Sequence, residues 1–129
     1  MSAFRVCLID DDIFVRDALS LGLRDAGYDV VAAPGAAAGL DIAKHGGVGA
    51  IVTDMNMPGT GGAQLIAEAR ALWPKMVIVA ISGATVIDGR PVPEIARELG
   101  ADETLVKPFR ARQLAEVIER ARAARDGSV

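Results

Sequence analysis

The apolar and polar residues of this chain form two kinds of pattern, and each pattern predicts one kind of element. Short apolar runs rich in β-branched side chains are typical of strands that are buried on both faces. Five runs of this kind occur along the chain: Phe4–Ile9, Tyr28–Ala32, Val48–Thr53, Met76–Ile81 and Thr104–Val106. They predict a sheet that is covered on both sides.

Between these runs, apolar residues recur at the three- and four-residue spacing of a helix face. The predicted helices are Ile13–Ala26, Gly35–His45, Ala63–Leu72, a short helix that starts near Pro91 and Pro93 and runs through Leu99, and Arg110–Ala124. The segment Thr85–Pro93 is longer than a common connection, and its Pro and Gly residues predict an ordered loop. This loop is either an ordinary insertion or a surface that contacts a partner.

Strands that alternate with helices predict an α/β fold with a parallel sheet. At this size the common solution is a doubly wound, flavodoxin-like (βα)5 sandwich with the strand order 2-1-3-4-5. The 129 residues are enough for one domain with a real core. We expect a single domain over residues 1–125 and a frayed tail over residues 126–129.

Composition and charge exclude several classes of protein. No apolar run approaches the roughly 20 residues that span a bilayer, and the N-terminus has no signal-peptide pattern. The single cysteine, Cys7, excludes an internal disulfide and indicates a reducing, cytoplasmic location. A formal charge of −3 and only five aromatic residues argue against nucleic-acid binding.

Polar residues follow four of the five predicted strands: Asp10-Asp11, Asp54, Ser82 and Lys107. Taken alone, Asp54 could equally cap the helix that follows it, and the Asp10–Asp12 run could be a solvated acidic turn. In the predicted strand order, however, these four strands are neighbours, so their ends converge on one cleft. Carboxylates there suit a hard divalent cation, and a hydroxyl and an ammonium suit phosphoryl oxygens.

Four short motifs together resemble the receiver domain of two-component response regulators, in the right order and over essentially the whole chain. The motifs are Ile9-Asp10-Asp11, Asp54-Met55-Asn56-Met57-Pro58-Gly59, Ile81-Ser82-Gly83 and Lys107-Pro108-Phe109. The resemblance implies a stand-alone, chemotaxis-regulator-like module that works in phosphorelay signalling. Such a module signals by protein contact and promotes only its own phosphorylation and dephosphorylation, so it is not an enzyme in the usual sense.

The resemblance also implies a role for each residue of the site. Asp54 is the expected phosphoacceptor, which takes its phosphoryl group from a histidine kinase or a histidine phosphotransferase. Asp11 is the expected direct Mg²⁺ ligand, Asp10 binds the metal through water, and the backbone carbonyl of Asn56 completes the site, in which Mn²⁺ could replace Mg²⁺. Ser82 is expected to hydrogen-bond a phosphoryl oxygen, and Lys107 to pair with Asp54 or its phosphate. The Lys107-Pro108 bond is often cis in this family.

One departure from the family concerns the route by which activation is transmitted. Many receivers carry an aromatic residue three positions before the lysine, and this chain has Thr104 there. No aromatic residue lies between Trp73 and Phe109, so an inward rotation of a ring cannot operate at this position. We expect the coupling between Ser82 and the surface beyond it to be weaker or to be built differently.

Two other functions compete with the receiver. The Asp10-Asp11-Asp12 run is similar to the start of a haloacid-dehalogenase-like Mg²⁺ phosphatase, but Phe14 stands where that family has Thr or Val, and the chain has no room for a cap domain. A flavodoxin-like FMN carrier would need a phosphate loop rich in Ser, Thr and Gly after the first strand. Three aspartates at that place would repel the phosphate.

Overall fold

The computed structural model describes residues 3–56 and 61–125 of the chain. The strands of its main sheet are β1 (Arg5–Ile9), β2 (Asp29–Ala33), β3 (Ala50–Asp54), β4 (Val77–Ser82) and β7 (Glu103–Val106). The helices are α1 (Ile13–Asp25), α2 (Ala36–His45), α3 (Gly62–Leu72), α4 (Val92–Leu99) and α5 (Ala111–Arg125). Met57, Pro58 and Gly59, and the tail expected over residues 126–129, lie outside the described residues.

The strand order of the main sheet is β2-β1-β3-β4-β7, and all of its pairings are parallel. This confirms the predicted α/β fold, because β7 is the fifth strand of this sheet along the chain. The two central strands β3 and β4 are buried at every position, as their apolar sequences predict. Since the strands run in parallel, their carboxyl ends meet at one edge of the sheet.

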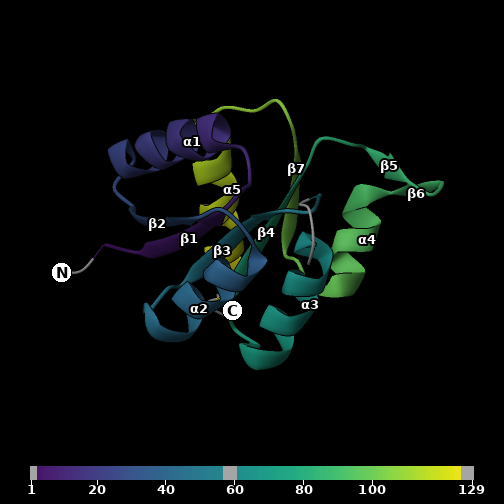
Figure 1. Cartoon of the computed structure of the whole chain (residues 1–129), viewed down its shortest axis with the longest axis horizontal. Helices are drawn as coiled ribbons and strands as arrows, with labels where there is room; N and C mark the ends of the chain where they lie inside the picture. The colour runs from purple at the N-terminus through teal and green to yellow at the C-terminus, as the bar shows by residue number, and fades with distance from the viewer. Residues whose placement is uncertain (1–2, 57–60, 126–129) are drawn as a thin grey trace.

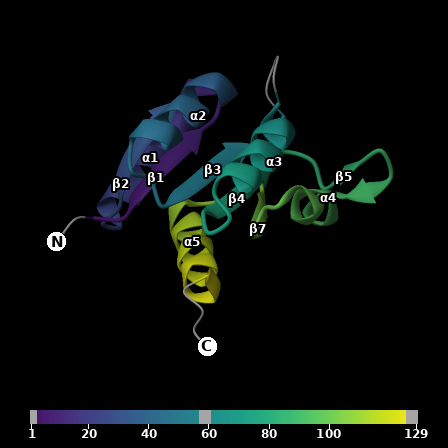
Figure 2. The ribbon, with the colours of Figure 1, turned by 90° about the horizontal axis from the view of Figure 1, so that it is seen from below.

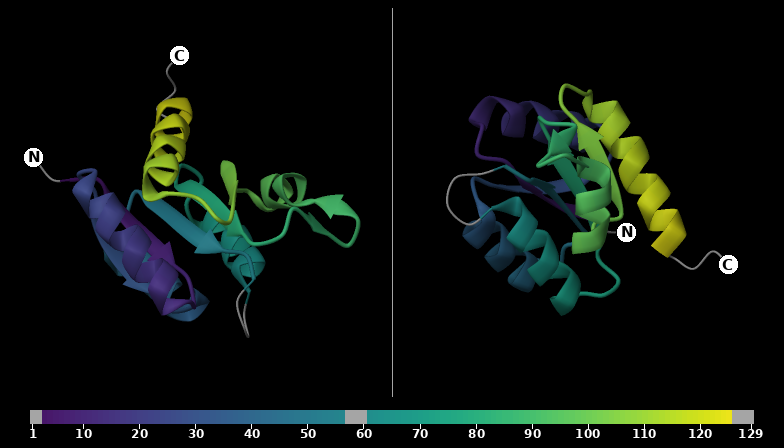
Figure 3. Two further views of the ribbon diagram at one scale, coloured as in Figure 1. Left: turned by 90° about the horizontal axis from the view of Figure 1, so that it is seen from above. Right: turned by 90° about the vertical axis from the view of Figure 1, so that its right-hand side faces the viewer.

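Helices cover both faces of the sheet and give the protein two separate cores. In Figures 1 and 3, α1 and α5 lie on one side of the strands, and α2 and α3 lie on the other. Leu19 and Leu23 of α1 pack with Leu114 and Ile118 of α5 in one core. The other core is formed by α2, α3 and α4, and its buried members include Ala43, Leu65, Ile66, Val92 and Ala96. None of the described helices is long and apolar enough to cross a membrane.

The turn after β1 uses one of its three aspartates as a helix cap. Asp12 is the N-cap of α1, and its side chain accepts hydrogen bonds from the backbone amides of Phe14 and Val15, at 2.9 and 3.3 Å. This satisfies two amides that have no partner within the helix. The cap uses the side chain of Asp12 alone, so those of Asp10 and Asp11 take no part in it.

The segment between β4 and α4 differs from the predicted loop. It forms an antiparallel hairpin of β5 (Val86–Ile87) and β6 (Arg90–Pro91), which projects beyond α4 in Figures 1 and 2. The turn residues Asp88 and Gly89 have φ values of 51° and 78°. Two left-handed residues in succession are typical of the Asp-Gly turn of a two-residue hairpin. The Asp-Gly pair was the signal that could have predicted this hairpin.

Gly62 lets the start of α3 approach the end of β3, where Asp54 lies. A Cβ atom at position 62 would stand 1.8 Å from the carbonyl oxygen of Asp54, and that oxygen belongs to the backbone and cannot turn aside. We therefore expect Gly62→Ala to lower the free energy of unfolding by about 1–3 kcal/mol, the usual cost of overpacking, as measured by urea unfolding.

Gly35→Ala is the matched control for this prediction. Gly35 also lies at the start of a helix, as the N-cap of α2, but a Cβ atom there would meet nothing within 4 Å. The control should lose less than about 1 kcal/mol, the cost of placing Ala where Gly is the helix N-cap. Equal destabilisation by the two substitutions would contradict the steric argument.

Candidate functional site: an acidic cluster at the carboxyl edge of the sheet

Polar side chains at the ends of four strands lie at the carboxyl edge of the sheet. Asp10 follows β1, Asp54 and Ser82 are the last residues of β3 and β4, and Lys107 follows β7. Asp54 pairs in register with Ile81, and the backbone amide of Lys107 donates a hydrogen bond to the carbonyl of Ser82 at 2.8 Å. The convergence expected from the strand order is therefore present.

Asp10 is fully buried, yet it retains one carboxylate oxygen without a hydrogen bond. Its Oδ1 accepts the backbone amide of Asp12 at 2.9 Å. Its Oδ2 lies 3.1 Å from Nζ of Lys107, close enough for an ion pair but without hydrogen-bond geometry. A buried carboxylate oxygen without a hydrogen bond is costly, so this oxygen is suited to a further positive ligand beside Lys107.

Asp54 is nearly buried, with 5% of its surface exposed, and is held by two donors. Its Oδ1 accepts the backbone amide of Asn56 at 2.9 Å, and its Oδ2 accepts Nζ of Lys107 at 2.9 Å. Burial acts to lower the pKa of Lys107, but the hydrogen bond to Asp54 and the negative charges of Asp54 and Asp10 outweigh it, so the pKa is raised. The lysine therefore remains an ammonium ion at every physiological pH.

The third carboxylate, Asp11, is exposed and completes an acidic cluster. One carboxylate oxygen from each of Asp10, Asp11 and Asp54 can be chosen so that the three lie within 4.8 Å of one another. Several carboxylate oxygens in an open, partly solvated site are the ligands that Mg²⁺ prefers. The donor set fits a hard divalent cation, whereas the role expected for the carbonyl of Asn56 stays a prediction.

Ser82 is fully buried and is turned toward its own loop. Its hydroxyl donates to the carbonyl of Ala84 at 2.9 Å and accepts the backbone amide of Ala84 at 3.0 Å. The structure thus places Ser82 at the expected edge, but its hydroxyl is engaged with Ala84. A hydroxyl has a single proton to donate, so it must leave the Ala84 carbonyl before it can donate to another group.

Arg16 is a site residue that the sequence argument missed. Its Nη1 donates to the backbone carbonyl of Asp10 at 2.8 Å, so α1 holds the main chain of the acidic turn in place. The signal was an arginine one turn after the Asp12 cap, on the helix that directly follows the acidic run. An arginine in a first turn opposes the helix dipole, which was a reason to seek a specific partner for it.

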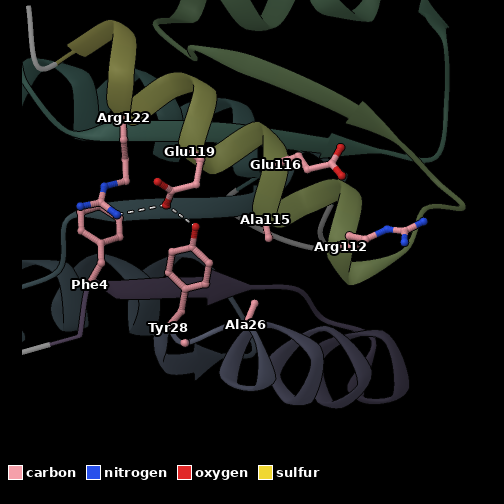
Figure 4. A pocket seen from close by; sticks show the side chains of 9 residues that line it. Phe4, Ala26, Tyr28, Arg112, Ala115, Glu116, Glu119 and Arg122 are labelled. Atoms are coloured by element: carbon pink, nitrogen blue, oxygen red, sulfur yellow. Dashed lines mark hydrogen bonds and ion pairs between the residues drawn. The ribbon is translucent and has the colours of Figure 1, made fainter. Parts of the chain in front are cut away.

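A groove lies at the end of the sheet opposite to the acidic cluster, and none of the residues of that cluster lines it. Its volume is about 550 Å³, and Figure 4 shows its lining between the start of β1 and β2 and helix α5. Glu119 accepts hydrogen bonds from the Tyr28 hydroxyl and from Arg122, and these contacts lower the pKa of Glu119. Arg122 also lies 3.9 Å from the centre of the Phe4 ring. These contacts join α5 to the residues directly before β1 and β2.

Comparison with known proteins identifies the family. Residues 6–119 match the family described as Response regulator receiver domain, which covers most of the chain. The chain belongs to this family. Receiver domains are signalling modules, and the alternative of a haloacid-dehalogenase-like phosphatase is not supported. The acidic cluster lies at the carboxyl edge of the sheet, where open α/β folds place their sites, and not in the groove beside α5.

Among curated relatives, this receiver is 35% identical to the response regulator protein FleR of Pseudomonas aeruginosa over 118 residues, which are 92% of the chain and 24% of FleR. It is 36% identical to the transcriptional regulatory protein PrrA of Mycobacterium tuberculosis over 119 residues, which are 92% of the chain and 48% of PrrA. The chain thus spans about a quarter to a half of these relatives. The stand-alone arrangement stays a prediction.

A solved receiver has the same fold over nearly the whole chain. The CheY-like receiver domain protein of Methanospirillum hungatei JF-1 superimposes with a TM-score of 0.89 at 25% identity. The match covers 99% of this chain and 100% of the other. The Lys107-Pro108 bond of the receiver described here is cis, as the family resemblance led us to expect.

Replacing Lys107 should destabilise the protein, because it would leave two buried carboxylates without their cation. We expect Lys107→Met to lower the free energy of unfolding by about 1–3 kcal/mol, the cost of leaving buried polar groups unpaired. Combining it with Asp10→Asn should restore part of this loss. Urea unfolding in EDTA at pH 7.5 measures both, and Lys75→Met, at an exposed lysine, is the control.

The sign of the pH dependence follows from the raised pKa of Lys107. A cation whose pKa is higher in the folded state stabilises the protein fully below its unfolded value of 10.5 and loses this effect as the pH rises through the folded pKa. The stability difference between wild type and Lys107→Met should therefore be constant from pH 7 to pH 9. A difference that already shrinks in that range would show that the ion pair is not the cause.

Proposed function

We propose that this chain is a Mg²⁺-dependent phospho-acceptor of a two-component phosphorelay and that Asp54 receives the phosphoryl group. The observation that carries the proposal is the cluster of Asp10, Asp11 and Asp54 beside the single ammonium group of Lys107. Phosphoryl transfer requires positioning and neutralisation of charge more than covalent help from the protein. The cluster and its lysine supply both.

In this proposal Asp54 is the nucleophile. One of its carboxylate oxygens forms the new bond to phosphorus while the P–N bond of a phosphohistidine breaks. The donor imidazole keeps the electron pair of that bond and takes up a proton. The backbone amide of Asn56 on Oδ1 and the ammonium of Lys107 on Oδ2 orient the carboxylate before the transfer.

The metal of the proposed reaction is Mg²⁺. Asp10, Asp11, Asp54 and the carbonyl of Asn56 would hold it, with Asp10 acting through water. The ion would neutralise charge on the phosphoryl oxygens. Mn²⁺ takes the same oxygen ligands and would substitute for it.

Lys107 and Ser82 would bind the transferred phosphoryl group. Lys107 already contacts Asp54 through Nζ, so the ammonium needs little movement to reach a phosphoryl oxygen on that residue. Ser82 would turn from Ala84 to donate to a second phosphoryl oxygen. The protein would promote only its own phosphorylation and dephosphorylation.

We propose a histidine kinase or a histidine phosphotransferase as the partner and the cytoplasm as the location. The net charge of −3 and the five aromatic residues support a protein partner over a nucleic acid. The one cysteine, Cys7, is buried, and burial raises its thiol pKa to about 12. Such a thiol is inert, in keeping with a reducing compartment.

The proposal is tested by adding acetyl phosphate and Mg²⁺ to the purified protein and measuring its intact mass. We expect a phosphoryl adduct on the wild type that EDTA abolishes and that Asp54→Ala lacks. Asp10→Ala should weaken adduct formation without eliminating it, because Asp11 and Asp54 still provide two carboxylates. An adduct that survives Asp54→Ala but requires Asp10 would overturn the assignment.

The surface beside the site supports a helical partner that brings the phosphohistidine. Phe14, on the first turn of α1, is 83% exposed, and Ile13 beside it is 51% exposed. A mostly apolar cleft of about 230 Å³ lies next to them, lined by Val15, Ala18, Leu19, Lys107, Pro108 and Phe109. An apolar cleft with exposed apolar side chains beside it is the kind of surface that receives the apolar face of a partner helix.

Phe14→Ala should therefore slow phosphotransfer from a cognate kinase about tenfold or more, as expected for an interface hot spot. It should leave phosphorylation by acetyl phosphate at the wild-type rate, because acetyl phosphate needs no docking surface. Leu72→Ala is the control, since Leu72 is 52% exposed but lies at the end of α3, away from the site. Equal effects of Phe14→Ala on both phosphate donors would argue against docking at α1.

A further inference from the structure

Asp11 is the one carboxylate of the acidic cluster whose side chain has no partner among the described residues. Oδ1 of Asp10 accepts the backbone amide of Asp12, and both oxygens of Asp54 accept hydrogen bonds. The exposed side chain of Asp11 forms no hydrogen bond or ion pair within residues 3–56 and 61–125. The main chain on either side of Asp11 therefore sets the position of its carboxylate.

Arg16 fixes that main chain at the peptide group between Asp10 and Asp11. The carbonyl of Asp10 belongs to this peptide group, and Nη1 of Arg16 donates to it at 2.8 Å. Because a peptide group is planar, a rotation of this carbonyl would also rotate the amide of Asp11 and redirect the bond from its Cα to its Cβ. The contact with Arg16 therefore restrains the direction in which the side chain of Asp11 leaves the turn.

This hydrogen bond differs from the others that hold the acidic turn. The amide of Asp10 donates to the carbonyl of Ala33 at 3.2 Å, but this bond lies before the peptide group that leads to Asp11. The amide of Asp12 donates to a carboxylate of the cluster itself, so a cation that draws on Asp10 competes with it. The half-buried side chain of Arg16 binds a main-chain oxygen and requires none of the carboxylates.

The charge of Arg16 acts in the opposite direction from its hydrogen bond. A guanidinium stays protonated in proteins, and this one is bound to the turn that carries two of the carboxylates. It repels a second cation, so its charge alone would weaken the binding of Mg²⁺. Its hydrogen bond would strengthen binding, because a ligand that is already in position needs less ordering when the ion binds. The two effects predict opposite changes when Arg16 is removed.

We propose that Arg16 is a positioning residue of the metal site. By binding the carbonyl of Asp10 it holds Asp11 ready to ligate Mg²⁺, and this effect outweighs the repulsion between its own charge and the ion. The proposal rests on the function proposed above and gives the first turn of α1 a share in the affinity for the metal. Arg16 acts through Asp11 and needs no contact with the ion or with the phosphoryl group.

Stabilisation of the protein by Mg²⁺ measures this affinity without any phosphorylation. An ion that binds only the folded state raises the free energy of unfolding according to its concentration and its Kd, so urea unfolding over a series of Mg²⁺ concentrations gives the Kd. We expect Arg16→Met to raise the Kd about tenfold, the lower end of the usual loss when a group that orients a metal ligand is removed. Arg16→Lys keeps the charge and a donor on a side chain one bond shorter, so its Kd should lie between the two.

Arg24→Met is the matched control. Arg24 also lies on α1 and also donates to a main-chain carbonyl, that of Val30 at 3.0 Å. It belongs to the last turn of the helix, away from the acidic turn. Its loss should lower the free energy of unfolding in EDTA but leave the Kd for Mg²⁺ at the wild-type value.

The rate of adduct formation with acetyl phosphate is the second readout. In Arg16→Met the Mg²⁺ concentration that gives half of the maximal rate should rise by the same factor as the Kd. A saturating concentration of Mg²⁺ should recover most of the wild-type rate, because the ion then holds Asp11 in place of the arginine.

A Kd that falls or stays the same in Arg16→Met overturns the proposal, and so does an equal rise in Arg24→Met, which would show a general loosening of α1. In each case the proposed function stands as long as Asp54 takes up the phosphoryl group. A wild-type protein that Mg²⁺ does not stabilise also overturns the proposal. If that protein forms no adduct on Asp54 either, the proposed function is overturned as well.

Discussion

The ammonium group of Lys107 lies between two carboxylates that the fold brings to one edge of the sheet. Two like charges 4 Å apart repel by about 4 kcal/mol at an effective dielectric constant of 20, which is a large part of the 5–15 kcal/mol that stabilises a typical domain. The fold tolerates two neighbouring carboxylates because Nζ of Lys107 contacts both Asp10 and Asp54. The cluster remains short of positive charge, and this shortage suits it to a metal ion and a transferred phosphoryl group.

The rest of the structure serves to hold these charges in place. Two apolar cores bury the central strands completely, so the ends of β3 and β4 have little freedom to move apart. Asp12 caps α1 and Arg16 holds the carbonyl of Asp10, which fixes the acidic turn from the helix side. Gly62 brings the start of α3 against the main chain of Asp54. The site is thus rigid on three sides, whereas Ser82 is followed by the segment that leads to the projecting hairpin β5–β6.

Much of the fold and of the site could be predicted from the sequence, because two kinds of signal are strong here. Buried parallel strands are apolar at nearly every position, and polar residues at their carboxyl ends must converge once the strand order is known. The hairpin was missed because strands of two residues, Val86–Ile87 and Arg90–Pro91, are too short to show a period. The contact of Arg16 with the main chain of Asp10 depends on where a long side chain reaches in three dimensions, which periodicity does not encode.

The central claim, that Asp54 carries the phosphoryl group, is tested most directly by locating the modified residue. Borohydride reduces an aspartyl phosphate to homoserine, and mass spectrometry of peptides then assigns the homoserine to one position. After treatment with acetyl phosphate and Mg²⁺, our account predicts homoserine at position 54 alone, and none when EDTA is present. Homoserine at position 10 or 11, or its formation without a divalent cation, would contradict the account.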